Sequence, residues 1–142
     1  MCAEGRPELS HGRNARIQQG QVSDAYLARN DVGQRGYSIV VWRGRHVAEA
    51  TELNAEEAVQ YLAEVLAVSR ALEAHYRPAK MNLMLLGNTV PHLHTHVIPR
   101  YVTDDSPGIP PRFMRVFPPT DEPPLLEADY EADVRALRER LS

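Results

Sequence analysis

One short stretch constrains this chain more than any other. Residues 91–99 read Pro-His-Leu-His-Thr-His-Val-Ile-Pro and hold three of the six histidines. Successive side chains of a β-strand point to opposite faces, so an extended backbone puts His92, His94 and His96 on one face. In an α-helix, His94 would point roughly 200° away from His92. The spacing therefore predicts a strand with a row of imidazoles along one side.

Three imidazoles in a row are compatible with catalysis, metal binding or a solvated strand. A ring nitrogen can act as a nucleophile, as an acid or base, as a hydrogen-bond donor to phosphate, or as a metal ligand. His-x-His on a strand can contribute to a zinc site. All three rings converge poorly on one ion, because the row spreads over roughly 13 Å, although two could bind with help from elsewhere. Six histidines placed at random rarely alternate in this way, which disfavours the solvated strand.

The stretch resembles the signature of the histidine triad (HIT) superfamily, His-φ-His-φ-His-φ-φ, in which φ is apolar. Residues 92–98 match at every position except Thr95, which is itself a good strand residue. Residues 80–91 are similar to the strand and turn of a bacterial branch in which Leu-Gly-Asn-x-Val-Pro precedes the triad. Asn88 stands where other members carry a glutamine after a longer glycine-rich loop. The resemblance is close over residues 80–100 and looser over 20–79.

The resemblance implies a fold and a chemistry. The fold is α+β: a mostly antiparallel sheet of about five strands, one long helix packed on it and a short C-terminal helix. The reaction is hydrolysis or transfer at the α-phosphate of a nucleotide conjugate, either a dinucleoside polyphosphate or a nucleoside phosphoramidate. His94 would be the nucleophile, flanked by His92 and His96, and the mechanism requires no metal or other cofactor. A homodimer is expected. The alternatives to an enzyme are a metal-binding protein that uses the three histidines as ligands and a nucleotide-binding protein without turnover.

The resemblance also implies phosphate and nucleotide contacts just before the triad. Asn88 and Thr89 lie in the turn into the triad strand, and their side chains can hydrogen-bond phosphate oxygens. Asn82 matches an asparagine that the family carries near the nucleotide on the preceding strand. Turn formation alone would explain Asn88 equally well, and solvent exposure alone would explain Asn82.

Three further positions correspond to family residues earlier in the chain. Asn30 or Asp31 stands where an acidic or amide residue contacts the ribose, although both also suit a turn. His46 matches a histidine that follows a basic turn, either at the margin of the site or on the open surface. Tyr37 takes the place of a histidine that backs the triad in many members.

The remaining pattern predicts the scaffold. Residues 37–42 and 81–86 are typical of strands, and a further strand is expected around 25–27. Asn54 fits a helix N-cap with Glu57 at the third position, and the helix ends at Arg77 before Pro78. Its apolar stripe is expected to be Val59, Leu62, Ala63, Leu66, Ser69 and Leu72.

A chain of 142 residues suits one domain with a single core. We divide it into a polar N-terminal segment (1–20), a HIT domain core (21–102), and a proline-rich arm with a C-terminal helix (103–142). Seven prolines between residues 103 and 124 favour an extended arm. The final helix, residues 127–141, has one apolar stripe: Tyr130, Val134, Leu137 and Leu141.

The charge, apolar content and single cysteine of the chain argue against several kinds of partner and location. A net charge of −3 argues against broad nucleic-acid binding. No apolar run approaches the roughly 18 residues that span a bilayer, and the N-terminus lacks the apolar region of a secretory signal. The single cysteine, Cys2, cannot form an intramolecular disulfide, and with His11 it offers too few ligands for a closed zinc site. We expect a cytoplasmic protein.

Overall fold

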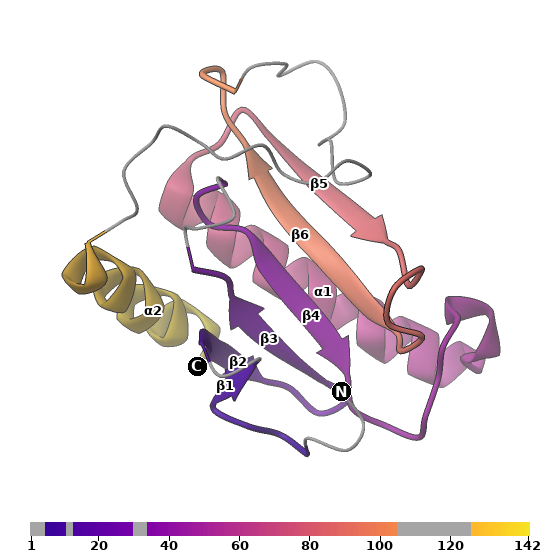
Figure 1. Cartoon of the computed structure of the whole chain (residues 1–142). Helices are drawn as coiled ribbons and strands as arrows, with labels where there is room; N and C mark the ends of the chain where they lie inside the picture. The colour runs from indigo at the N-terminus through magenta and orange to yellow at the C-terminus, as the bar shows by residue number, and fades with distance from the viewer. Residues whose placement is uncertain (1–4, 11–12, 30–33, 105–125) are drawn as a thin grey trace.

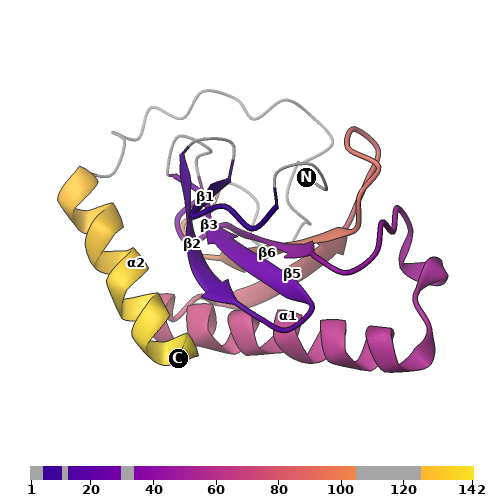
Figure 2. The same ribbon diagram turned by 90° about the horizontal axis from the view of Figure 1, so that it is seen from below.

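The computed structural model describes residues 5–10, 13–29, 34–104 and 126–142. They form a six-stranded sheet with a long helix along one face and a second helix at the side (Figures 1 and 2). The strands are β1 (Leu9–Ser10), β2 (Asn14–Gln19), β3 (Ser23–Leu27), β4 (Ser38–Trp42), β5 (Lys80–Leu85) and β6 (His94–Arg100). The helices are a short 3-10 turn, η3 (Ala50–Glu52), then α1 (Ala55–Tyr76) and α2 (Glu127–Leu141).

The α+β fold with one long helix and a C-terminal helix is thus confirmed. The sheet exceeds the expected five strands by the two-residue β1. β1 and β2 both fall within residues 1–20, the segment that the sequence set apart from the core, so the sheet begins earlier than expected. The positions of Cys2, His11, Asn30, Asp31 and most of the proline-rich arm lie outside the described residues.

The strand order is β1-β2-β3-β4-β6-β5, and every neighbouring pair is antiparallel. β6 therefore lies inside the sheet, between β4 and the edge strand β5. The register pairs Val41 with His94, Ile39 with His96, and His96 with Met84. Directly paired residues point to the same face, so these side chains share the face that carries the histidines.

Helix α1 begins and ends as the sequence predicts. The Asn54 side chain accepts a hydrogen bond from the Glu57 N–H at 2.9 Å, and the Glu57 carboxylate accepts one from the Asn54 N–H. Arg77 ends the helix in a left-handed conformation, with φ of 50°.

The predicted apolar stripe of α1 is only partly confirmed, because Ser69 and Leu72 are buried but the first three residues of the stripe are exposed. Val59 and Leu62 are 71% and 54% exposed, whereas the side chains against the sheet include Tyr61, Val65, Val68 and Leu72. Both sets recur at three- and four-residue steps, so helical periodicity alone could not choose between them.

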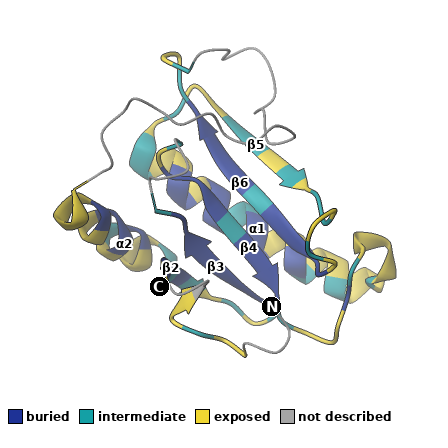
Figure 3. Cartoon of the chain, viewed as in Figure 1, coloured by how far each residue is buried: buried dark blue, intermediate teal, exposed yellow. Residues whose placement is uncertain are grey.

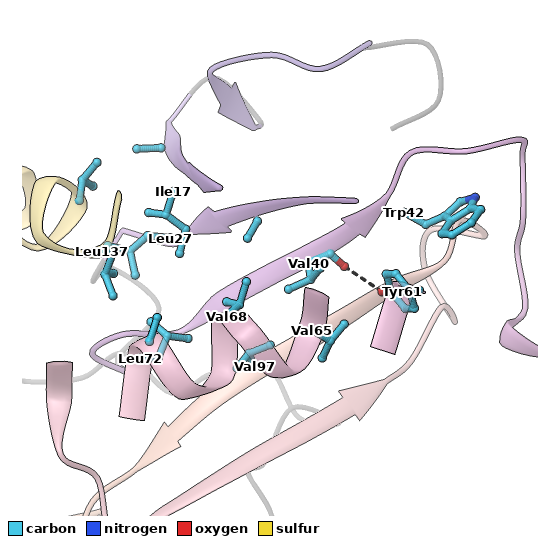
Figure 4. Close-up of a cluster of buried hydrophobic side chains, with 14 of the residues drawn as sticks. Ile17, Leu27, Val40, Trp42, Tyr61, Val65, Val68, Leu72, Val97 and Leu137 are labelled. Carbon is cyan, nitrogen blue, oxygen red and sulfur yellow. Dashed lines mark hydrogen bonds between the residues drawn. The ribbon is translucent and has the colours of Figure 1, made fainter. Parts of the chain in front are cut away.

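The core lies between the sheet and α1, and α2 closes one side of it (Figure 4). Tyr130, Val134 and Leu137 of α2 are buried, as its apolar stripe predicts. The Tyr130 hydroxyl accepts from the Ala15 N–H and donates to the Leu27 carbonyl, each at 2.8 Å, which ties α2 to β2 and β3. No helix in the described part of the chain is long and apolar enough to cross a membrane.

Candidate functional site

The alternation along the triad strand sorts its side chains as expected. Leu93 and Val97 belong to the core beneath α1. The Thr95 hydroxyl lies 2.9 Å from the Tyr61 hydroxyl of α1, and Tyr61 also donates to the Val40 carbonyl at 3.1 Å (Figure 4). The departure from an apolar residue at Thr95 therefore has a local explanation, because its buried hydroxyl has a partner. The histidines consequently face away from α1.

His94 is held by its own strand. Its Nδ1 lies 2.6 Å from the backbone carbonyl oxygen of His92, and the residue is only 8% exposed. A carbonyl oxygen can only accept, so Nδ1 carries the hydrogen. The neutral ring then has its lone pair on Nε2. This tautomer is the one that a nucleophilic imidazole needs if Nε2 is to attack.

His92 has a different arrangement. Its Nε2–H donates to the Trp42 carbonyl at 2.7 Å, and the side chain is buried. Burial lowers its pKa below the usual range, so the ring is neutral at pH 7. The side chain thus fastens the triad to the end of β4, while its backbone carbonyl orients His94. The exposed His46 lies at the margin of the site, with its ring centroid 5.8 Å from that of His92.

His96 completes the row. Its ring centroid lies 4.9 Å from that of His94, and its Nδ1 lies 2.6 Å from the Tyr37 hydroxyl. The rings of Tyr37 and His96 stack, with 5.8 Å between centroids and 12° between planes. Burial, and secondarily the neighbouring His94, lowers the pKa of His96 to about 4. Burial also raises the pKa of Tyr37, so both groups are neutral at pH 7.

Asn88 and Thr89 lie in the connection between β5 and β6, and both are exposed. This connection covers residues 86–93, so both residues lie near the end of β6 that starts with His94. Gly87 adopts a φ of 123°, a conformation that glycine permits, and it makes the turn possible.

Asn82 is on the histidine face but further along the sheet. It pairs with Ile98, whereas Met84 pairs with His96. Its side-chain oxygen accepts a hydrogen bond from Arg100 Nη1 at 3.2 Å, and Arg100 also donates to Asp104 at 2.7 Å. The Asn82 side chain is therefore hydrogen-bonded to Arg100, and it does not lie beside His94.

The resemblance placed Tyr37 where a histidine backs the triad, and the structure puts its hydroxyl against His96. The hydrogen bond itself was not predicted, because the partner of a side chain on another strand depends on register. Arg100, 5% exposed, follows the same alternation on β6, and it contacts Asn82 and Asp104. Within the described residues, no three His, Cys, Asp or Glu side chains are grouped so that they could hold a metal ion.

The chain is similar to several known proteins in sequence and fold. A curated relative named Protein hit, from Bacillus subtilis (strain 168), is 32% identical over 89 residues; the match covers 58% of this chain and 61% of the relative. Among solved structures, a histidine triad protein from Bradyrhizobium japonicum is similar with a TM-score of 0.77 and 26% identity. One from Marinobacter aquaeolei VT8 has a TM-score of 0.71 and 29% identity. In both cases the match covers 91% of each chain.

The family assignment comes from the sequence of the domain itself. Residues 22–103, which include β3 to β6, α1 and the whole triad, match the HIT domain family. That range is more than half of the 142 residues. The chain therefore belongs to the HIT domain family.

Proposed function

We propose that this protein is a nucleotide hydrolase or transferase that acts at the α-phosphate of a nucleotide conjugate through a covalent nucleotidyl-histidine at His94. One observation carries the proposal: the His92 carbonyl holds the hydrogen on Nδ1 of His94 and leaves the lone pair on Nε2. An imidazole in this state is an effective nucleophile and splits one displacement into two steps.

In the first step, the Nε2 lone pair forms a bond to the α-phosphorus. The bond from phosphorus to the leaving group breaks, and its electron pair departs with that group. In the second step, a water oxygen bonds to phosphorus and the phosphorus–nitrogen bond breaks. Its electron pair returns to Nε2, the proton of the water passes to solvent, and a nucleoside monophosphate is released.

The transferred group carries negative charge, which fixed donors must stabilise. His96 is adjacent to His94, and Asn88 and Thr89 lie at the same end of β6. We assign these three the phosphate contacts. His46, exposed beside His92, is a candidate contact for the leaving group. Asn30 stays a predicted ribose contact.

A second apolar cluster favours a substrate with an apolar, aromatic portion. Ala28, Tyr37 and Ile98 form it, and the partly buried Ile39 and Met84 pack against it. Ile39 and Met84 both pair with His96, so the cluster borders the histidine row. A nucleobase would cover the exposed parts of Ile39 and Met84, whereas a simple phosphate ester would not.

We also propose a homodimer through the β5 side of the molecule. Glu64 of α1 accepts from the Gln21 N–H at 2.8 Å, so that flank of the helix faces the β2–β3 turn. Leu62 lies about 160° around the helix from Glu64 and so faces β5. Leu62, Leu83 and Leu85 are 54%, 38% and 52% exposed, beside an edge strand that is exposed along much of its length (Figure 3).

A second copy would cover this apolar surface and satisfy the free edge of β5 within the described sheet. Leu85→Lys places a charge there, and we expect it to shift the protein to monomer in sedimentation or light scattering. Val102→Lys alters a residue that is 79% exposed outside this surface and is the matched control. A monomeric wild type would contradict the homodimer.

The function is tested by release of nucleoside monophosphate from a small panel: diadenosine tetraphosphate, diadenosine triphosphate and an adenosine phosphoramidate. We expect turnover of at least one substrate, unaffected by EDTA and abolished in His94→Ala. His75→Gln alters a histidine that contacts Asp133 instead of the triad and serves as control. An adduct of nucleotidyl mass on the wild type, absent from His94→Ala, would identify the intermediate.

Two other outcomes have defined meanings. Binding of a substrate without release of any monophosphate would indicate a nucleotide-binding protein and would contradict the enzyme. Turnover that EDTA abolishes would contradict the metal-independent mechanism.

A further inference from the structure

Tyr37 and His96 form a closely held pair on the histidine face. Their polar atoms are 2.6 Å apart and their rings are nearly parallel. Tyr37 is 6% exposed, and its carbonyl accepts from the Ala28 N–H at 2.9 Å. Gly36, immediately before it, has its Cα against Tyr76 and Pro99, where an added Cβ would lie within about 3 Å of both side chains. The phenol is thus fixed in place by its surroundings.

The hydrogen bond between them can run in two directions. If Tyr37 donates to Nδ1, the neutral ring carries its hydrogen on Nε2. If Nδ1–H donates to the phenol oxygen, Nε2 carries a lone pair instead. Burial raises the pKa of the Tyr37 phenol, which keeps its hydrogen on the oxygen, and an imidazole nitrogen is a stronger acceptor than a phenol oxygen. The O–H to Nδ1 direction is therefore favoured.

The direction matters because His96 is adjacent to the proposed nucleophile. A lone pair on Nε2 would repel the oxygens of a phosphoryl group, whereas an N–H would donate to them. We propose that Tyr37 is a positioning residue that holds His96 in the tautomer with hydrogen on Nε2, so that the row presents an N–H donor to the transferred group. The catalytic part of this inference rests on the proposed function, whereas the tautomer itself does not.

The two neighbouring histidines then have opposite tautomers for opposite tasks. The His92 carbonyl accepts from Nδ1 of His94 and so leaves a lone pair on Nε2. The Tyr37 hydroxyl donates to Nδ1 of His96 and so leaves a hydrogen on Nε2. The backbone acceptor prepares Nε2 of His94 to act as a nucleophile, and the phenolic donor prepares Nε2 of His96 to donate a hydrogen bond. His96 would stabilise charge in this form without transferring a proton.

The test is nitrogen-15 NMR of the histidine rings at pH 7, on wild type and Tyr37→Phe. In the wild type we expect His96 to show an unprotonated Nδ1 and a protonated Nε2. In Tyr37→Phe both signals should move toward the average of mixed tautomers, while those of His94 stay in place. A wild-type His96 with its hydrogen on Nδ1, or an unchanged spectrum in the variant, would overturn the proposal.

Kinetics give the second readout. Loss of one hydrogen bond predicts about a tenfold fall in kcat for Tyr37→Phe, with KM little changed. Tyr61→Phe is the matched control, because it removes a hydroxyl that contacts the same strand from the other face; it should lower stability and leave the His96 tautomer and kcat unchanged. An unchanged kcat in Tyr37→Phe overturns the positioning role, and a wild type with no turnover refutes the proposed function while the NMR result still decides the tautomer.

Discussion

The two faces of β6 belong to one strand but differ in their side chains: one face packs against α1, and the other carries the histidines. On the face toward α1, Thr95 and Val97 are 1% and 0% exposed, and the one hydroxyl is paired with Tyr61. On the other face, His94 and His96 each have Nδ1 fixed by a neighbour. The polar groups of the first face find their partners within the protein, whereas the second face carries ring nitrogens that we propose contact a substrate. We therefore expect that substitutions on the face toward α1 change mainly the stability of the fold, whereas substitutions on the histidine face change mainly the activity.

The sharpest test of this separation compares His94→Ala with Val97→Ala. We expect His94→Ala to reduce turnover by at least about 10⁴-fold, because no covalent intermediate can form, with a small effect on unfolding. Val97→Ala should cost about 2 kcal/mol of unfolding free energy, because two buried methyl groups are lost, and should retain most of the activity. Chemical denaturation and the monophosphate assay measure both. Equal loss of activity in the two variants would contradict the separation.

A change of pH should affect the histidine face selectively. His96 binds a proton only near pH 4 in the folded protein, against about 6.5 in the unfolded chain. Between these values the unfolded state binds more protons, so the unfolding free energy falls as the pH is lowered from about 6.5 toward 4. The loss from His96 is at most about 3 kcal/mol, and His92 adds to it in the same direction.

The measurement is denaturation at several pH values, with His96→Gln as the comparison. That variant should lose the largest part of the acid sensitivity, while Thr95→Val on the opposite face should keep it. A wild type whose stability is flat between pH 6.5 and 4.5 would show that His96 titrates normally.

The smallest effects concern the hydroxyl pair beneath the strand. Tyr61→Phe should destabilise the protein by about 1–2 kcal/mol, because the Val40 carbonyl and the Thr95 hydroxyl lose a buried partner. Thr95→Val leaves Tyr61 its bond to Val40 and should cost less. In the double variant the losses should not add, because no Thr95 hydroxyl remains without a partner. Strictly additive unfolding free energies would show that the two hydroxyls do not interact.

Local patterns predicted much of this molecule. Three histidines at alternate positions define a strand face whatever surrounds them, and Asn54 with Glu57 defines a helix start within four residues. The buried side of α1 was missed in its first turns, because Leu62 and Tyr61 lie on equally regular stripes and only the packed sheet distinguishes them. Strand β2 was missed because its sequence, Asn-Ala-Arg-Ile-Gln-Gln, has few apolar residues, so most of its strand signal comes from pairing with β3.

Long-range partners could not be predicted for the same reason. Tyr37 reaches His96, and Asn82 reaches Arg100, only because β4, β6 and β5 adopt one particular register. Shifting a strand by one residue would turn each of these side chains to the other face. The spacing of residues in the sequence shows which side chains share a face of one strand, whereas the contacts of a histidine ring depend on how three strands pair.

The group that orients His94 is a backbone carbonyl, and this has a consequence for how the protein tolerates mutation. Any amino acid at position 92 supplies the same carbonyl, so no single substitution there can delete the acceptor that sets the tautomer of His94. The Tyr37 hydroxyl, by contrast, is lost in one substitution. One substitution at position 37 can thus change the tautomer of His96, whereas the tautomer of His94 is set by the backbone of β6.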